Sequence, residues 1–212
     1  MPATVLLIRH PESTWNRRGR YQGQQDSRLS PLGSAQAELV ATRLSRSRID
    51  GILCSPLQRA RSLARSIGRH HGIRPVSDER LIEISHGTWE GLTRAEVEIR
   101  YPELYRDWID RPHEVRFPEG ESLSDVHERS IPVIEGLLRA DDRTWVVVTH
   151  DTVVRLAVAA ARREPVTGFA NVQLENAGIT TLVGPPLAGS VRVINDVTHL
   201  GESHVDLKGQ AL

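Results

Sequence analysis

The first apolar run of the chain ends in a charged pair that constrains both fold and chemistry. Residues 5–8 are all apolar, and Arg9 and His10 follow them directly. A short apolar run of this kind predicts a buried β-strand, with the charged pair at its carboxyl end. In open α/β sheets, ligands bind at that end of the strands. An imidazole placed there can attack an electrophile, and a guanidinium can bind two oxygens of a phosphate.

Strand and helix patterns alternate along most of the chain. The apolar runs predict strands at residues 4–8, 51–54, 145–149, 178–183 and 191–197. Ser30-Pro31 and Ser55-Pro56 each place an N-cap residue before a proline, which is typical of the first turn of a helix. Such alternation predicts parallel strands joined by covering helices. We therefore expect an α/β fold of three layers, α/β/α, with a mostly parallel central sheet.

The middle of the chain, about residues 86–120, has a different composition. It contains Trp89, Tyr101, Tyr105 and Trp108 together with Pro102, Pro112 and Pro118. Short helices and loops inserted between sheet elements are expected here, as a helical lid over the strand edge. A chain of 212 residues can bury one core without metals or disulfides. The expected organisation is a single domain, 1–212, with a lid-like insertion at about 86–120.

Charge and apolar content exclude several classes of protein. Lys plus Arg and Asp plus Glu number 27 each, so no overall basic field attracts nucleic acid. Cys54 is the only cysteine, which excludes an internal disulfide and a cysteine-cluster metal site. The sequence contains neither an apolar run long enough for a membrane span nor a signal-peptide pattern. We expect a cytoplasmic protein that binds neither nucleic acid nor membranes, and a homodimer is left open.

The predicted strand at 145–149 also ends in a histidine, His150. Because the carboxyl ends of parallel strands meet at one edge of a sheet, His10 and His150 should share that edge. Arg59 follows Ser55-Pro56 and should lie near the same edge, at a helix start whose N–H groups favour anions. These histidines and arginines together predict a phosphate pocket. The chain has no Gly-x-x-x-x-Gly-Lys loop, which disfavours nucleoside triphosphate binding.

Several short motifs resemble, in the same order, those of a known family. They begin with Arg9-His10-Pro11-Glu12-Ser13-Thr14-Trp15-Asn16, Leu29-Ser30-x-x-Gly33 and Ser55-Pro56-Leu57-x-Arg59-Ala60. They continue with Leu81-x-Glu83, Gly87-x-Trp89-Glu90-Gly91, Gly120-Glu121-Ser122 and Val148-Thr149-His150. As a set, spanning nearly the whole chain, they are similar to the signature of the histidine phosphatase superfamily, the phosphoglycerate mutase-like family.

The resemblance implies a role for each residue of the expected pocket. His10 would be the nucleophile that attacks phosphorus and forms a phosphohistidine. The phosphoryl oxygens would be neutralised by Arg9, Arg59 and His150, with Asn16 as a further hydrogen-bond donor.

Glu83 would be the general acid for the leaving alcohol and then the base for the incoming water. Its apolar neighbours would raise its pKa, as an acid working near neutrality requires. The resemblance implies a small phosphorylated metabolite as substrate, and no metal ion or cofactor.

Two positions depart from the family pattern. The glycine that usually follows the first histidine is Pro11 here, which removes that backbone N–H as a donor to the ligand. The residue after the second histidine, commonly glycine, is Asp151. A carboxylate facing a phosphate dianion would weaken its binding, so Asp151 is expected to turn away or to cap the following helix.

The resemblance also bears on the substrate. The mutases of the family carry a basic insert that holds a second phosphate, and this chain shows none, which favours a phosphatase. Three stretches look like those of metal-independent phosphoserine phosphatases, and they imply substrate contacts by Gln22, Gly23, His86 and His199. His86 would be an imidazolium beside the substrate carboxylate; the alternative is that His86 caps a loop and His199 is a surface residue. The alternatives are a phosphatase of sugar phosphates or phosphoglycerate derivatives, a cofactor-dependent phosphoglycerate mutase, and a non-catalytic phospho-ligand binding module.

Overall fold

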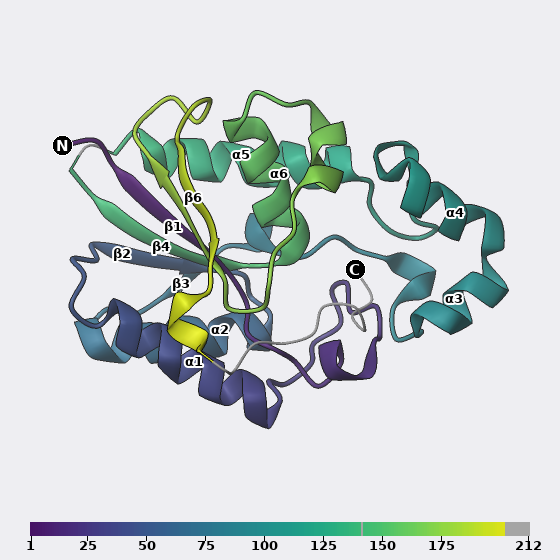
Figure 1. Ribbon diagram of the computed structural model, residues 1–212, viewed down its shortest axis with the longest axis horizontal. Coiled ribbons are helices and arrows are strands. Elements are labelled where there is room, and N and C mark those ends of the chain that lie inside the picture. The colour runs from purple at the N-terminus through teal and green to yellow at the C-terminus, as the bar shows by residue number, and fades with distance from the viewer. Residues whose placement is uncertain (141, 202–212) are drawn as a thin grey trace.

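A six-stranded mixed sheet runs through the centre of the molecule (Figure 1). The computed structural model describes residues 1–140 and 142–201 of the chain. The strands, in the spatial order β3-β2-β4-β1-β5-β6, are Val76–Ser77, Gly51–Cys54, Thr144–Thr149, Thr4–Arg9, Ile179–Val183 and Val191–Asp196. The first four strands are parallel, whereas β5 is antiparallel to both β1 and β6. The predicted α/β fold with a mostly parallel sheet is confirmed.

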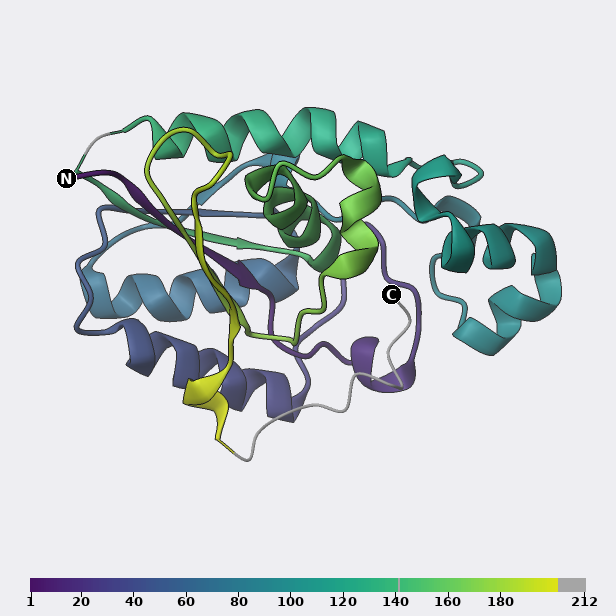
Figure 2. The same ribbon diagram turned by 45° about the horizontal axis from the view of Figure 1, so that its top comes forward.

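Helices cover both faces of the sheet, which gives the molecule three layers (Figure 2). The covering helices are α1 (Pro31–Leu44) and α2 (Gln58–His71) on one face, and α5 (Leu123–Leu138) and α6 (Asp151–Ala161) on the other. Ile8 and Val148 belong to the core under α1 and α2, whereas their neighbours Leu7 and Val147 belong to the core under α5 and α6. This alternation follows from the two-residue period of a strand.

The start of α2 differs from the sequence prediction. Ser30 caps α1 as expected, with its hydroxyl accepting a backbone N–H of the first turn. Ser55-Pro56, however, does not begin α2, which starts at Gln58, whose backbone N–H is accepted by Oδ1 of Asp26 at 2.8 Å. The Ser55 hydroxyl accepts the backbone N–H of Leu57 at 3.3 Å, before the helix, and also lies 2.7 Å from Nε2 of His150. Ser55, which the local pattern predicted to be an N-cap, thus also contacts His150, and this contact connects the ends of β2 and β4.

The insertion at 86–120 projects beyond the end of the sheet (Figure 1). It contains a 3-10 turn at Gly87–Trp89, the helices α3 (Arg94–Arg100) and α4 (Pro102–Asp110), and a second 3-10 turn at Pro112–Glu114. A capping box between Thr93 and Glu96 begins α3. The fully buried ring of Trp89 contacts Tyr21 from the body of the molecule, with centroids 5.1 Å apart. Aromatic packing thus ties the insertion to the sheet layer.

Short 3-10 helices fill other connections, at Asn16–Arg18, Glu79–Leu81, Val166–Asn171 and Thr198–Leu200. Within residues 1–140 and 142–201, no helix combines the length and the apolar composition needed to cross a membrane.

Candidate active site

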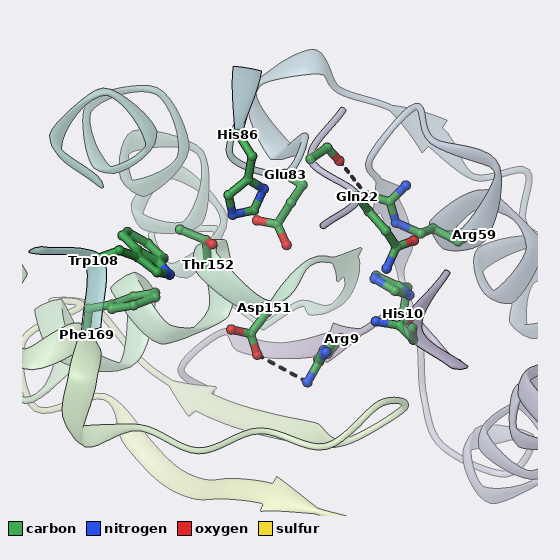
Figure 3. Close-up of a pocket in the computed structure, with 12 residues that line it drawn as sticks. Arg9, His10, Gln22, Arg59, Glu83, His86, Trp108, Asp151, Thr152 and Phe169 are labelled. Atoms are coloured by element: carbon green, nitrogen blue, oxygen red, sulfur yellow. Dashed lines mark hydrogen bonds and ion pairs between the residues drawn. The ribbon is translucent and has the colours of Figure 1, made fainter. Parts of the chain in front are cut away.

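One pocket beyond the carboxyl end of β1 gathers most of the predicted site residues (Figure 3). It is lined by Arg9, His10, Asn16, Gln22, Gly23, Arg59, Glu83, His86, Trp108, Asp151, Thr152 and Phe169. The residues up to His86 are those that the sequence predicted. Segments far apart in the chain therefore meet at the sheet edge where a ligand was expected.

His10 is held as a neutral ring with a defined proton position. Its Nδ1 lies 2.7 Å from the carbonyl oxygen of Pro11, which can only accept a hydrogen bond. The proton therefore sits on Nδ1, and Nε2 keeps its lone pair. Burial, reinforced by the cations Arg59 and Arg9, lowers the pKa of His10 well below its usual range. Pro11, which gives up a donor N–H, thus contributes its carbonyl to the orientation of this ring.

His150 lies fully buried beside His10 and is not itself among the residues that line the pocket. The two ring centroids are 5.2 Å apart, with the edge of one ring toward the other. Nε2 of His150 contacts the Ser55 hydroxyl at 2.7 Å. Burial first, and then Arg59, lower the pKa of His150 well below its usual range. Two neutral imidazoles thus lie side by side: His10 lines the pocket and His150 lies behind it.

Two buried guanidinium groups flank His10, and backbone carbonyls hold both. Arg59 donates to the carbonyl oxygens of Gly23 at 2.7 Å and Gln25 at 2.8 Å. Arg9 donates to the carbonyl of Leu174 at 2.6 Å. Burial lowers the pKa of Arg59 to about 10, which still leaves it cationic at neutral pH. The neutral carbonyls cancel none of the charge of Arg59, so the pocket favours an anion, whereas Arg9 is also ion-paired with Asp151 at 3.2 Å.

Gly23 permits the contact with Arg59 because of its backbone shape. Its φ is +50°, a conformation that glycine adopts without strain. A Cβ at this position would lie 1.9 Å from Oε1 of Glu90. A side chain at position 23 would therefore strain the turn that presents its carbonyl to Arg59 and would require the Glu90 carboxylate to move.

Gln22 and Asn16 are oriented by hydrogen bonds to their side-chain oxygens. Oε1 of Gln22 accepts from the hydroxyls of Ser13 at 2.7 Å and Ser27 at 2.6 Å. Oδ1 of Asn16 accepts from the backbone N–H of Ser13 at 3.0 Å. With its oxygen engaged, Gln22 presents its NH2 group toward His10 (Figure 3). An amide donor thus complements the two guanidinium groups.

Glu83 supplies a carboxyl group on another side of the pocket (Figure 3). The side chain is buried, and its Oε1 accepts the backbone N–H of Ile84 at 2.9 Å. Burial is the main cause that raises the pKa of Glu83, as the apolar neighbours predicted. The second cause is the negative charge of Asp151, which the sequence analysis did not foresee. Both causes favour the protonated form, which can donate a proton.

His86 lies in an aromatic wall rather than in a charged surface. Its ring contacts Phe117 at 4.8 Å, Tyr21 at 5.2 Å and Trp108 at 6.2 Å between centroids. Burial, with a smaller contribution from Arg59, lowers its pKa to about 3. The expected imidazolium is therefore corrected to a neutral imidazole in this structure. Its Nδ1 is buried and has no hydrogen-bond partner among the described residues.

The arrangement can transfer a phosphoryl group. A neutral imidazole between two guanidinium groups can attack phosphorus while the cations neutralise the phosphoryl oxygens. A carboxyl group with a raised pKa can protonate a leaving oxygen. In the two described ranges, no group of three or more His, Cys, Asp or Glu side chains is placed to hold a metal ion.

Residues 5–197 match the family described as "Histidine phosphatase superfamily (branch 1)". The chain belongs to the histidine phosphatase superfamily. One relative is Phosphoserine phosphatase 1 of Hydrogenobacter thermophilus, 36% identical over 203 residues, which cover 95% of this chain and 96% of the relative. Members with such names hydrolyse phosphoric monoesters, and this histidine phosphatase is an enzyme of that class.

Two solved structures share the fold. Bacillus stearothermophilus YhfR superposes with a TM-score of 0.86 at 30% identity, covering 93% of this chain and 99% of that one. A mycobacterial glucosyl-3-phosphoglycerate phosphatase has a TM-score of 0.80 at 30% identity, covering 91% of this chain and 98% of that one. Relatives of similar fold thus carry names for different substrates.

The structure places two predicted features of this histidine phosphatase elsewhere. His199 is not among the residues that line the pocket, and its Nε2 lies 3.2 Å from the carbonyl of Ala177. The C-terminal residues 202–212, which include the rest of the predicted substrate segment, lie outside the described residues. Asp151 neither turns away nor caps a helix with its side chain: it faces the pocket and forms an ion pair with Arg9 at 3.2 Å (Figure 3).

Three lining residues were not predicted, namely Trp108, Thr152 and Phe169. Trp108 belongs to the aromatic-rich insertion, so its composition was a signal that pointed to the wall without naming the residue. Phe169 lies in the 3-10 helix Val166–Asn171, with its ring centroid 5.9 Å from that of Trp108. Nothing in the local sequence of Phe169 indicates this long-range pairing.

Proposed function

We propose that this histidine phosphatase hydrolyses phosphoric monoesters through a phosphohistidine intermediate, and that its substrate is L-phosphoserine. The observation that carries the mechanism is the state of His10. Burial and two arginines favour the neutral ring, and the Pro11 carbonyl draws the proton to Nδ1. Nε2 is thereby left as a nucleophile beside Arg9 and Arg59.

In the first step, Nε2 of His10 attacks phosphorus, and the bond between phosphorus and the ester oxygen breaks. Arg9 and Arg59 neutralise the phosphoryl oxygens. The buried His150 packs against the ring of His10, with the two centroids 5.2 Å apart. Glu83 gives its proton to the departing alcohol, so that no alkoxide is released. The products are the free alcohol, a phosphohistidine and an ionised Glu83.

In the second step, the ionised Glu83 removes a proton from a water molecule that attacks the phosphohistidine. The bond between phosphorus and Nε2 breaks, and inorganic phosphate leaves. His10 returns to its neutral form and Glu83 to its protonated form, so the cycle closes without another reactant. No step requires a metal ion.

The character of the pocket wall supports a compact substrate with one phosphate. Of the described lining residues, only Arg9 and Arg59 are cationic. The described part of the pocket therefore has no further cation that could bind a second phosphate. This favours hydrolysis over mutase chemistry, which must retain a phosphorylated intermediate. His86 lines the pocket and can contact the amino-acid part of the substrate. The full-length likeness to a phosphoserine phosphatase supports the same substrate.

The mechanism is tested by trapping the intermediate. Brief exposure to 32P-labelled phosphoserine should label the wild-type protein with an acid-labile group, and His10→Ala should abolish both labelling and turnover. Phosphate release should persist in excess chelator. Turnover that stops in EDTA, or label that remains in His10→Ala, would contradict the mechanism.

The substrate is tested by a comparison of phosphorylated metabolites and two His86 variants. Phosphoserine should have a higher kcat/KM than 3-phosphoglycerate, sugar phosphates and glucosyl-3-phosphoglycerate. His86→Phe keeps the aromatic packing but removes the ring nitrogens, and should raise KM for phosphoserine about 10- to 100-fold, the value of one hydrogen bond to a charged group. His86→Gln, which keeps an N–H donor, should raise KM for phosphoserine by a smaller factor. If His86→Phe raised KM equally for phosphoserine and for an aryl phosphate, His86 would not recognise the amino-acid part of the substrate.

A further inference from the structure

The site contains an anion where an anionic substrate must bind. Asp151 is only 4% exposed, and its carboxylate faces the same pocket as Arg9 and Arg59 (Figure 3). A carboxylate beside a phosphate dianion repels it, and burial strengthens the repulsion. The carboxylate of Asp151 therefore weakens the binding of an anionic substrate.

Asp151 forms ion pairs with two arginines, Arg9 at the end of β1 and Arg155 on α6. Its Oδ1 lies 3.2 Å from Arg9, and its Oδ2 lies 2.7 Å from Arg155, one turn further along α6. The guanidinium of Arg155 stacks 5.0 Å over the ring of Phe169, in the aromatic wall. A continuous series of contacts thus connects the wall, through Arg155 and Asp151, to the cation that is expected to bind phosphate.

We propose that Asp151 shares Arg9 with the phosphoryl group and thereby limits how tightly the site holds phosphate. Arg9 is already held by the Leu174 carbonyl, so the carboxylate is not needed to keep the guanidinium in place. Its effect is on charge: it cancels part of the attraction that Arg9 exerts on the bound anion. Weaker retention of inorganic phosphate lets the product leave.

The same carboxylate acts on the general acid. Glu83 is faced by Asp151, Arg59 and Arg9, by the Thr152 side chain and by the N–H of Ile84. Asp151 is the only anion in that set, and it opposes the cations, which would otherwise stabilise the ionised carboxyl. This part of the inference rests on the proposed role of Glu83 as a proton donor.

The test compares Asp151→Asn with the wild-type enzyme. Asparagine keeps the size of the side chain but removes the charge, so the Kd for inorganic phosphate, measured by calorimetry at fixed pH, should fall by about tenfold. The kcat should fall as well, and the alkaline limb of the pH–kcat/KM profile should move to lower pH, because Glu83 then ionises more readily. A residue with a merely structural role would weaken phosphate binding on substitution.

Two further variants keep the outcome decisive. Arg155→Gln frees Asp151 from its second partner, so its carboxylate opposes the anion more strongly and the Kd for phosphate should rise. Asp107→Asn removes a helical i,i+4 ion pair with Arg111 on α4 and should change neither Kd nor the pH profile. An unchanged or raised Kd in Asp151→Asn, or a lowered Kd in Arg155→Gln, would overturn the inference. Phosphohistidine labelling of the wild-type enzyme judges the proposed mechanism separately, whatever the result for Asp151.

Discussion

The two sides of the pocket are built by different physical means. On the sheet edge, Arg9, His10 and Arg59 are each fixed by a short hydrogen bond to a backbone carbonyl. On the opposite wall, His86 and Trp108 are held by ring contacts that impose no single direction. The comparison teaches that the groups proposed for chemistry are locked by directional bonds, whereas those proposed for leaving-group selection are shaped by packing.

The largest effect on the chemistry is expected when the proposed proton donor, Glu83, is removed. Glu83→Gln keeps the shape of the carboxyl but cannot supply a proton, so kcat for phosphoserine should fall by about 10²- to 10⁴-fold. An aryl phosphate with an acidic leaving group needs little protonation in the first step, so its kcat/KM, which reports that step, should fall much less than the kcat/KM of phosphoserine. Steady-state kinetics with both substrates gives the ratio. Equal losses would mean that Glu83 acts on the attacking nucleophile or on folding rather than on the leaving group.

The buried titratable groups in and behind the pocket, on both of its sides, should make folding sensitive to acid. His10, His86 and His150 have lowered pKa values in the folded state, so each takes up a proton on unfolding below about pH 6.5. Glu83, with a raised pKa, opposes this by holding a proton that the unfolded chain releases. Because three histidines outnumber the one glutamate, the free energy of unfolding should fall with each pH unit from 6.5 toward 5.

Urea denaturation at several pH values measures this slope. His86→Phe removes one titrating group from the wall and should reduce the slope by about 1.4 kcal/mol per pH unit. Stability that stays constant over the same range would mean that these rings are protonated in the folded protein.

A smaller effect is expected from the aromatic wall itself. Trp108→Leu removes ring contacts with His86, Phe117 and Phe169. Because such pairs contribute about 0.5 to 1.5 kcal/mol, KM for phosphoserine should rise about three- to tenfold. Acid-labile labelling at saturating substrate should stay at the wild-type level. Loss of labelling would show that the wall also holds the nucleophile in place.

The smallest effect is expected where the insertion begins. Thr93→Ala deletes the N-cap of α3 and should lower the free energy of unfolding by about 1 kcal/mol. The activity of the folded enzyme should not change, because Thr93 does not line the pocket. Ser122→Ala, which deletes the matching capping box of α5, is the control in the body of the molecule. A change in kcat for Thr93→Ala alone would connect the order of α3 to the chemistry.

Local patterns predicted the sheet edge and missed the details of its charges. The runs that end at Arg9 and Thr149 were recognisable as strands, and the order of the motifs led to Arg59 and Glu83. Ser55 was misassigned as a cap because its partner, His150, is distant in the chain. Asp151 was expected to avoid the pocket because a lone carboxylate is unfavourable there. Arg9 and Arg155, which compensate it, cannot be paired with it from sequence alone.

The sequence by itself determined the order of strands and helices and the residue types at their ends. Those depend on apolar periodicity and on neighbours along the chain, so the phosphate-binding edge could be read from it. Only the tertiary structure decided the proton position on His10, the neutral state of His86, the pairing of Asp151 and its effect on Glu83. The physical reason is that the free energy of a charge depends on the burial and the other charges around it, and these come from distant segments that the fold brings together.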